Sequence, residues 1–560
     1  MKTASIRRIA ALGLTPAVLL GVGHAQTTRE EILRLPAPLR AAASDFGAEA
    51  CAPGAVVAAL GGEASLGPFN GLEIAGATTI GPAALGADWR ALVGEQISRE
   101  GLARIAARVE CRYREAGFVF ARASVTGDPA DGRYTLRVRE GKVARVEVAA
   151  GDDALAGALL RAFRGVHAGA PLNAADVRQG LANAASIGIV DVRPTVRRSR
   201  ADPDAIDLIL VAGGAVHQLF VQAQNANDVP LGPWGAVAGV RLVGLTPRTT
   251  FGVYFSEDGE SQQAAQASVE ALLSPGGLKA QIDAAYALAR PGDRLAPLEI
   301  EGRTTFFSGE ISHPIEVRRG FIAGWRVGFE AIDQRTEFFG STLLNDDSLR
   351  VARLGVRADG LWRGAVWNAD VDLRRGVKGL GASEAGDTGL SRPDADPEAL
   401  VVRAETSAAL AIGPGAMRLA ARGQHTDASL LAFEEFNFGA LSGGRAFVPG
   451  AIAGDRGVAL NLEVSSPAFV YKRVTAQPFA FVDAARAWNE GVAPVRRQDG
   501  ASAGAGLRVD FFERARLEVL YAEPFETRGL APGAAGANVH VQFATALDFT
   551  FAGGFKRRSR

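Results

Sequence analysis

The ten residues 365–374, AVWNADVDLR, decide the fold of the larger part of the chain. Apolar or small side chains occupy every second position, and Asn, Asp and Arg fill most of the positions between them. This period of two is typical of a β-strand with one apolar and one polar face. Residues 354–359 and 507–511 repeat the pattern. Because the polar faces carry acidic and basic residues together, they suit a water-filled interior.

The alternating pattern extends from about residue 216 to residue 551, where the helical period almost disappears. A water-soluble β-sandwich also alternates, but such a domain seldom runs to this length without dividing. About 16 strands of roughly 9–11 residues would occupy half of the region and leave the rest for turns and loops. The sequence therefore predicts an all-β transmembrane barrel of about 16 antiparallel strands at residues 214–551, followed by a tail at 552–560.

Residues 69–213 show a different, α+β pattern in which strands alternate with helices. In residues 69–142 we expect a strand at 72–74, a helical segment at 89–93, a helix at 98–116, and strands at 118–125 and 134–138. In residues 143–213 we expect a strand at 143–148, helices at 155–163 and 174–185, and strands at 190–196 and 206–211. Two tandem units of about 70 residues with the same element order indicate an internal structural repeat.

The first 25 residues have the pattern of a signal peptide. Lys2, Arg7 and Arg8 precede an apolar stretch at residues 9–22, and Ala25 supplies the small residue for cleavage. At ~1.5 Å per residue this apolar stretch is too short to cross a hydrocarbon core of about 30 Å. We therefore expect export, with an N-terminal helix at 28–46 and a linker completing residues 26–68.

The sequence carries no pattern of catalytic chemistry. Its six histidines lack metal-ligand spacing, and no nucleophile elbow, phosphate-binding loop or dinucleotide-binding glycine pattern occurs. Lys plus Arg and Asp plus Glu balance at 61 each, which argues against a nucleic-acid partner. We therefore expect a protein that is not an enzyme and has no catalytic residue, metal or cofactor.

Several short motifs follow one another along the chain in a fixed order. They are YREAGF at 113–118, VREGKV at 138–143, SGEISHP at 308–314, GGRAF at 443–447, GDRG at 454–457 and FVDAA at 481–485. Together they resemble the transporter (TpsB) family of two-partner secretion, the ShlB/FhaC/HecB-type haemolysin secretion and activation proteins of the Omp85 superfamily. In the family, Gly stands where this sequence has Ala446 and Ala485.

This resemblance implies two periplasmic POTRA domains, at 69–142 and 143–213, and a barrel in the outer membrane of a Gram-negative bacterium. It also implies that a long loop folds back into the barrel, through a loop–barrel motif comprising Arg445, Phe447, Gly454, Asp455, Phe481 and Asp483. We expect Arg445 at the loop tip to pair with Asp483 on the following strand, inside the barrel. The helix at 28–46 would plug the resting pore, as in some relatives.

The expected function is type V secretion of a large unfolded exoprotein of the TpsA class, adhesin-like or haemolysin-like. The client-binding residues are unknown, but edges and grooves within 69–213 are suited to β-augmentation. Further expected partners are outer-membrane lipid, periplasmic chaperones and the barrel-assembly machinery. Three alternatives stay open: an Omp85-type insertase, which usually has more POTRA units, a passive porin, which needs none, and a soluble two-sheet binding protein.

The two cysteines, Cys51 and Cys111, are too few for a disulfide scaffold or a zinc site. In the oxidising periplasm they could form one disulfide. That bond would pin the segment before the first repeat against its long helix. Two buried free thiols are the alternative.

Overall fold

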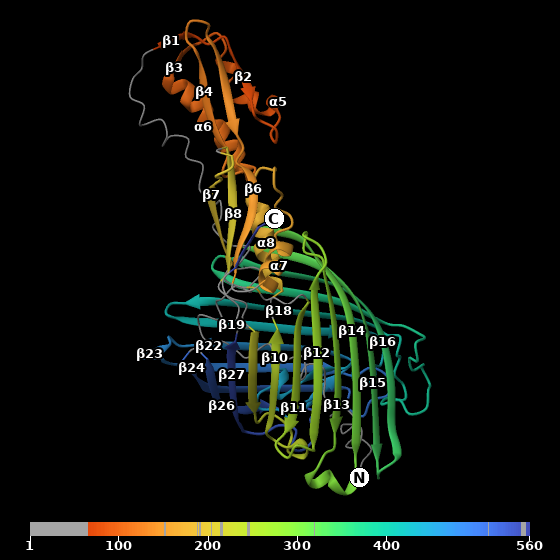
Figure 1. Ribbon diagram of the computed structural model, residues 1–560. Coiled ribbons are helices and arrows are strands. Elements are labelled where there is room, and N and C mark those ends of the chain that lie inside the picture. The colour runs from red at the N-terminus through yellow and green to blue at the C-terminus, as the bar shows by residue number, and fades with distance from the viewer. Residues whose placement is uncertain are drawn as a thin grey trace. The chain divides into compact units, whose positions relative to one another are not determined.

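The structure is a computed structural model (Figure 1). It describes residues 65–549 and 556–559, apart from 151–152, 188, 190–191, 203, 213–216, 243–246, 319 and 513. The signal peptide, the N-terminal helix and the linker predicted before residue 65 therefore lie outside the described residues. The described chain divides into two compact units: residues 65–212 with 556–559 form the smaller one, and residues 217–549 form the larger one.

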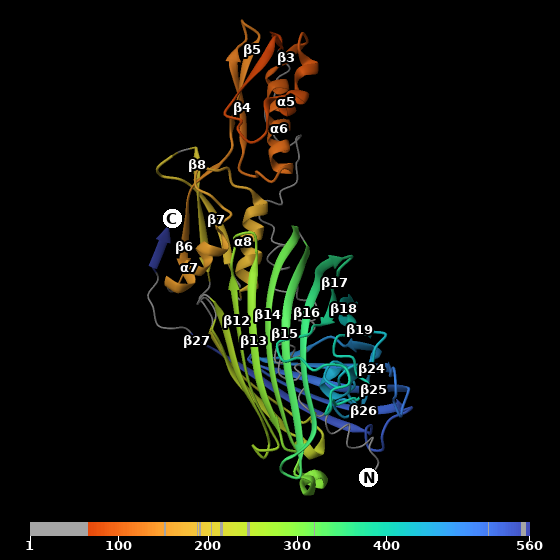
Figure 2. The same ribbon diagram turned by 90° about the vertical axis from the view of Figure 1, so that its right-hand side faces the viewer.

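The first copy of the predicted repeat packs one long helix against a three-stranded sheet (Figure 2). The sheet consists of β2 (Gly71–Ala75), β5 (Arg133–Arg139) and β4 (Arg122–Asp128), and the short strands β1 (Ser65–Pro68) and β3 (Gln96–Ser98) pair beside it. Helix α6 (Arg99–Glu115) begins after Ser98, whose hydroxyl accepts a hydrogen bond from the Gly101 amide over 3.1 Å. Leu102, Ile105 and Val109 are buried on its apolar side, as the helical period predicts.

The helix expected at 89–93 is absent from this part of the described chain. Three short pieces take its place, namely α5 (Pro82–Leu85), η3 (Gly86–Asp88) and η4 (Arg90–Leu92). Gly86 and Gly94 bound the segment and leave too few residues for a cooperative α-helix. Trp89 and Leu92 pack against the core of the first copy but are only partly buried, and Val93 is 50% exposed, so the expected helix is wrong and the segment is not deeply buried.

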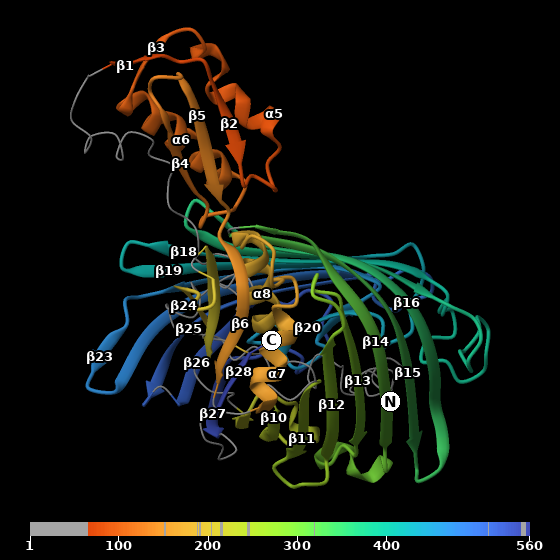
Figure 3. The same ribbon diagram turned by 45° about the horizontal axis from the view of Figure 1, so that its top comes forward.

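The second copy has the same order of elements and the same sheet topology. Its strands are β6 (Lys142–Ala150), β7 (Val192–Arg198) and β8 (Ala205–Ala212), and its helices are α7 (Asp153–Ala162) and α8 (Ala174–Ser186). As in the first copy, the first and last strands are parallel and the middle one is antiparallel. A further strand, β28 (Lys556–Ser559), pairs with the free edge of β6 (Figure 3).

The larger unit is a closed antiparallel barrel of sixteen strands, as predicted. They are β9 (His217–Gln224), β10 (Gly235–Leu242), β11 (Arg248–Ser256), β12 (Gln262–Leu272), β13 (Lys279–Ala289), β14 (Glu301–Arg318), β15 (Phe321–Phe338), β16 (Thr342–Trp362), β17 (Ala365–Gly376), β18 (Leu400–Ile412), β19 (Gly415–His425), β22 (Arg456–Ser465), β24 (Val474–Trp488), β25 (Arg497–Phe511), β26 (Ala515–Glu526) and β27 (Asn538–Phe549). A three-residue strand, β23 (Phe469–Tyr471), pairs with the start of β24. Pairing of β27 with β9 closes the ring.

The barrel is apolar outside and polar inside, the reverse of a water-soluble β-domain. On β24, Phe479, Phe481 and Asp483 are buried on the inner face, whereas Val482 between them is 44% exposed. Exposed Leu and Val on β16, β17 and β22 continue the outer apolar surface. This alternation is the pattern of a lipid-facing wall around a polar lumen. Among the described residues, no helix is long and apolar enough to cross a membrane.

Two details of the barrel differ from the sequence predictions. Strands β14, β15 and β16 have 18, 18 and 21 residues, so they are far longer than a membrane crossing requires. The family strand that SGEISHP at 308–314 resembles ends in a Pro turn, and this expectation is wrong here, because β14 continues through Pro314 to Arg318. The register shifts between Pro314 and Glu316. Such a bulge accommodates proline, which lacks the amide hydrogen needed for regular pairing.

Candidate functional site in the barrel lumen

The connection between β19 and β22, residues 426–455, folds into the barrel, and we call it the lumen loop. Its strands β20 (Phe436–Phe438) and β21 (Ile452–Gly454) form a small hairpin, and the single turn η7 (Ala440–Ser442) lies between them. Phe438, Ala446 and Phe447 are fully buried and belong to one apolar cluster with inward-facing Phe479 and Phe481 of β24. The lumen loop is therefore packed against the wall from inside.

Gly454 of the expected loop–barrel motif, and Ala446 between the motif residues Arg445 and Phe447, are both small because of this close packing. A Cβ atom at Gly454 would lie only 2.6 Å from the carbonyl oxygen of Trp488, so glycine lets β21 approach the wall. Ala446 has no exposed surface, and its carbonyl accepts a hydrogen bond from Gly536 over 3.1 Å. A single methyl group therefore fits at the position where the family has glycine.

Arg445 lies at the tip of the lumen loop, against two carboxylates of the wall. Its Nε atom is 3.4 Å from Asp483 Oδ2, and its Nη1 atom is 3.3 Å from Glu463 Oε2. The Arg445 amide donates to Asp483 over 3.3 Å, and the guanidinium carbon lies 3.8 Å from the centre of the Phe481 ring. The tip is thus held by backbone, charge and ring contacts at once.

Asp483 is fully buried and also receives a neutral hydrogen bond. Asn461 donates to its Oδ1 atom over 2.8 Å and to the Gly443 carbonyl over 2.6 Å, so one amide bridges the wall and the loop. Asp483 lies on β24, with β22 between it and the loop, so it is one strand further along than expected. On the other side, the His540 imidazole contacts the Arg445 carbonyl oxygen.

Sequence reasoning missed two charged residues of this site, Glu463 and Arg508. Arg508 has no exposed surface, and its Nη1 atom lies 2.7 Å from Glu463 Oε1. It also bonds Glu518 over 2.6 Å and stacks 3.9 Å from the Phe479 ring centre. The available signal was alternation: Glu463 occupies an inward position between Leu462 and Val464 of β22, which are both exposed.

Asp455 is the hub of a second contact set, at the barrel end where the longest connections gather. Its Oδ1 atom is 2.7 Å from Arg392 Nη1 and accepts the Leu430 amide over 2.6 Å. Its Oδ2 atom accepts the Glu490 amide over 2.7 Å. These three partners belong to three different connections, residues 377–399, 426–455 and 489–496. One fully buried carboxylate therefore ties the lumen loop to both neighbouring loops.

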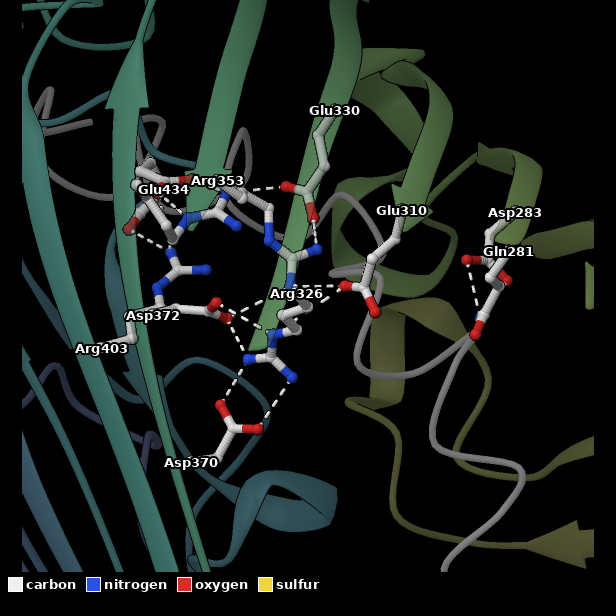
Figure 4. A network of polar contacts seen from close by, with 11 residues as sticks. Gln281, Asp283, Glu310, Arg326, Glu330, Arg353, Asp370, Asp372, Arg403 and Glu434 are labelled. Carbon is white, nitrogen blue, oxygen red and sulfur yellow. Dashed lines mark hydrogen bonds and ion pairs between the residues drawn. The ribbon is translucent and has the colours of Figure 1, made fainter. Parts of the chain in front are cut away.

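The part of the wall formed by β15, β16 and β17 carries a larger network of arginines and carboxylates (Figure 4). Arg326 bonds Asp370 over 2.8 Å, and Arg353 lies 3.2 Å from Asp372 on β17. Arg374 of the same strand forms two ion pairs, one with Glu330 over 2.8 Å and one with Glu434 of the lumen loop over 2.6 Å. A cavity of about 510 Å³ borders these side chains. The lumen is thus charged, hydrophilic and only partly filled by the loop.

The smaller unit contains one buried carboxylate held by neutral donors. Glu140 accepts the amides of Thr78 and Thr79, each over 2.7 Å, and the Tyr113 hydroxyl over 2.8 Å. Burial alone would raise the pKa of Glu140, but these hydrogen bonds hold it below its ordinary value. Burial and the neighbouring carboxylate raise the pKa of Tyr113. Glu140 lies between the two copies of the repeat and fixes the segment after β2 against β5.

In the described residues, the two larger sheets of 69–213 leave three strand edges open for the expected client-binding surface. They belong to β2, β4 and β7, whereas β28 occupies the edge of β6. Cys111 lies on α6 and is half-buried, but Cys51 lies outside the described residues, so the disulfide stays a prediction. Within the described part of the chain, no group of three or more potential ligands could hold a metal ion.

Comparisons with known proteins give two family matches and a full-length structural likeness. The family of haemolysin secretion/activation proteins ShlB/FhaC/HecB matches residues 331–509, and the ShlB-type POTRA domain matches residues 68–141. CdiB from Escherichia coli superposes with a TM-score of 0.73 at 18% identity, covering 98% of this chain and 99% of that chain. CdiB from Acinetobacter baumannii gives 0.61 at 16% identity, covering 98% of each. No curated protein matches in sequence.

The two kinds of match carry different information. At such low identity, the structural likeness shows the fold alone. The larger family match spans the whole lumen loop and also Glu463, Asp483 and Arg508. The site described above therefore lies inside the segment on which the family is recognised.

Proposed function

We propose that this chain is a member of the haemolysin secretion/activation (ShlB/FhaC/HecB) family, because the model of that family matches residues 331–509 and its POTRA domain matches residues 68–141. Its barrel lies in the outer membrane and its POTRA domains lie in the periplasm. We propose further that it exports a large unfolded partner exoprotein to the cell surface. It is a transporter of the two-partner secretion type. Because β9 follows the POTRA domains in the chain, the barrel end where β9 begins faces the periplasm. The connections 377–399, 426–455 and 489–496 lie at the outer end.

The observation that carries the proposal is a charged lumen that is partly filled by the lumen loop. Polar contacts help to hold this loop in place. A translocating chain needs a hydrated path, and paired charges line such a path without offering apolar surface to which a client would stick. The lumen loop fills part of this path, so it must move during export. Beside the apolar cluster around Phe447 and Phe481, ion pairs and hydrogen bonds hold the loop to the wall, and water and a passing chain can replace these polar contacts.

Client capture is assigned to the open strand edges of the POTRA domains. An extended segment can add to the edge of β4 or β7 through main-chain hydrogen bonds that depend little on sequence. Such weak, sequence-tolerant binding suits a client that must be handed on to the barrel. The disulfide between Cys51 and Cys111 and the inward plug at 28–46 remain part of this proposal.

The experiment compares surface display of an exoprotein with and without this chain. The probe is a large exoprotein of the TpsA class with an N-terminal secretion domain, expressed with the wild-type chain, with no chain, or with a chain lacking residues 69–213. Display that requires the full chain supports the proposal. Display without it would contradict the proposal, and loss of other outer-membrane barrels when the chain is depleted would favour an insertase instead.

A further inference from the structure

The hairpin formed by β23 and the start of β24 exposes apolar side chains at the periplasmic end of the barrel. Phe469, Val470 and Tyr471 are 63%, 70% and 72% exposed. Phe469 pairs with Ala476 and Tyr471 with Val474. These pairs share a face with Ala480 and Val482, because side chains two residues apart point the same way. Phe469 and Tyr471 therefore lie on the outer face of the barrel.

This outer face continues without interruption into the neighbouring strands. Val474 pairs with Phe511, and Phe511 pairs with Ala515 of β26. Further along the same strands, outward Val482, Leu507 and Val519 are exposed, as expected of lipid-facing positions. The hairpin thus extends the lipid-facing surface toward the periplasmic side, where a bilayer has its headgroups.

Three cations border this apolar surface: Lys472, Arg473 and Arg514, all exposed. The Phe512 amide donates to the Arg473 carbonyl over 2.8 Å, which places the two turns side by side. Lys472 lies 5.3 Å from the centre of the Tyr471 ring. Within the described residues none of the three cations forms an ion pair, whereas the nearby Arg516 is paired with Asp510 over 2.7 Å. Glu513 lies outside the described residues, so with it the corner carries a net charge of 3 − 1 = +2.

We propose that this corner, residues 469–473 with 512 and 514, is a binding site for anionic phospholipid in the inner leaflet of the outer membrane. Phe469 lies among the upper acyl groups as an apolar ring, and Tyr471 lies at the level of the glycerol groups, where a ring with a polar hydroxyl is stable. Lys472, Arg473 and Arg514 bind the phosphate of the headgroup. A lipid occupant explains both features at once, since apolar surface and exposed cations meet at the depth where acyl chains and phosphates meet.

A second turn at the same end has the same composition. Trp362, at the end of β16, is 65% exposed, and the guanidinium of Arg363 lies 5.1 Å from the centre of its ring. An exposed aromatic beside a cation therefore occurs at two periplasmic turns on different strands. This repetition argues for contact with a continuous surface such as a leaflet, and against one protein partner that covers a single hairpin.

The test measures lipid retention by the purified full-length protein. Protein in detergent is mixed with phosphatidylglycerol and phosphatidylcholine, and bound lipid is counted by native mass spectrometry. Wild-type protein should retain phosphatidylglycerol preferentially. The variant K472Q/R473Q should lose this preference by roughly fivefold for each cation removed. The matched control R294Q/R528Q, which removes two exposed cations at the outer end, should behave like wild type.

Two outcomes would overturn the proposal. One is an unchanged preference for phosphatidylglycerol in K472Q/R473Q, with the heat-modifiable mobility of a folded barrel preserved. The other is found with a photo-crosslinker at position 471 in cells: labelling of the exoprotein and not of lipid would make the corner a client contact. Lipid retention is measured without any client, so its failure is distinguishable from failure of the secretion proposal.

Discussion

Two charged regions of the lumen use the same chemistry in different ways. At the loop tip, the cation belongs to the lumen loop and the carboxylates belong to the wall. In the network of Figure 4, most partners lie on strands of the wall itself. The first arrangement joins a movable segment to a fixed one. The second joins neighbouring strands that the barrel already holds together.

The two regions also differ in redundancy. Arg353 lies near Glu330 and Asp372, and each of these carboxylates has a second arginine, Arg374 and Arg326 respectively. In the described part of the chain, Asp483 has ion-pair contact with Arg445 alone. A buried carboxylate with one cation is costly to leave unpaired, while a shared one loses little. The position of an ion pair and the number of its partners, more than the count of charges, therefore decide which pair controls the loop.

The largest expected effect follows from breaking the loop-tip pair. Arg445→Asp and Asp483→Arg should each abolish secretion, because each places like charges together in a buried site and removes about 3–5 kcal/mol of loop anchoring. Surface display of the exoprotein is measured against barrel folding, by heat-modifiable mobility. A folded Arg445→Asp variant that secretes at the wild-type level would remove the functional role of the pair.

A smaller effect is expected at the Asp455 hub. Asp455→Asn keeps the shape and weakens the contact with Arg392, so the outer loops should loosen while the loop tip stays anchored. We expect a several-fold rise in channel conductance in planar bilayers, with secretion reduced but present. Lys378→Gln is the control, because Lys378 pairs with Glu398 in the same loop but is exposed. Equal conductance of the two variants would contradict the role of the hub.

The wall network should tolerate loss of one member. Arg353→Gln leaves Glu330 with Arg374 and Asp372 with Arg326, so secretion should change by no more than about twofold. Ion selectivity of the channel should shift toward cations, because one positive charge leaves the lumen. Secretion as low as in Arg445→Asp would show that the two regions are not distinct.

The alternating pattern within a strand was enough to predict which side chains point into the barrel. It was not enough to predict which residues of distant strands and loops pair with each other. Alternation places Phe481 and Asp483 inside and Val482 outside, because neighbouring side chains of a strand face opposite ways. The partners of Glu463 and Asp455, Arg508 and Arg392, are 45 and 63 residues away. Such pairs depend on the register of the closed barrel, which the pattern within one strand does not contain.

Glu140, in the smaller unit, differs from the buried carboxylates of the lumen. Among the described residues, its partners are neutral donors and not cations. Because its pKa lies below the ordinary value of 4.5, its carboxylate stabilises the first POTRA domain above the unfolded-state pKa. This stability is lost as the pH falls through the lower, folded-state pKa. Glu140→Gln should reduce protection of α6 amides against hydrogen exchange by about 1–3 kcal/mol at neutral pH, with little effect on secretion. Protection that rises on acidification would contradict this assignment.

The smallest effect on secretion is expected from the predicted disulfide. Pairing of Cys51 with Cys111 would contribute roughly 2–4 kcal/mol by restricting the unfolded chain. Replacing both cysteines with serine should lower the thermal stability of the periplasmic unit and leave transport near normal. Alkylation of both thiols in unfolded, unreduced protein would show that the bond does not form.

The central claim is that the ion pair between Arg445 and Asp483 holds the lumen loop in its resting place. The most direct measurement is surface display by the double variant R445D/D483R, compared with each single variant. The reversed pair should restore part of the secretion lost in either single variant, because opposite charges again meet across loop and wall. No recovery in a folded double variant, or normal secretion by Arg445→Ala, would contradict it.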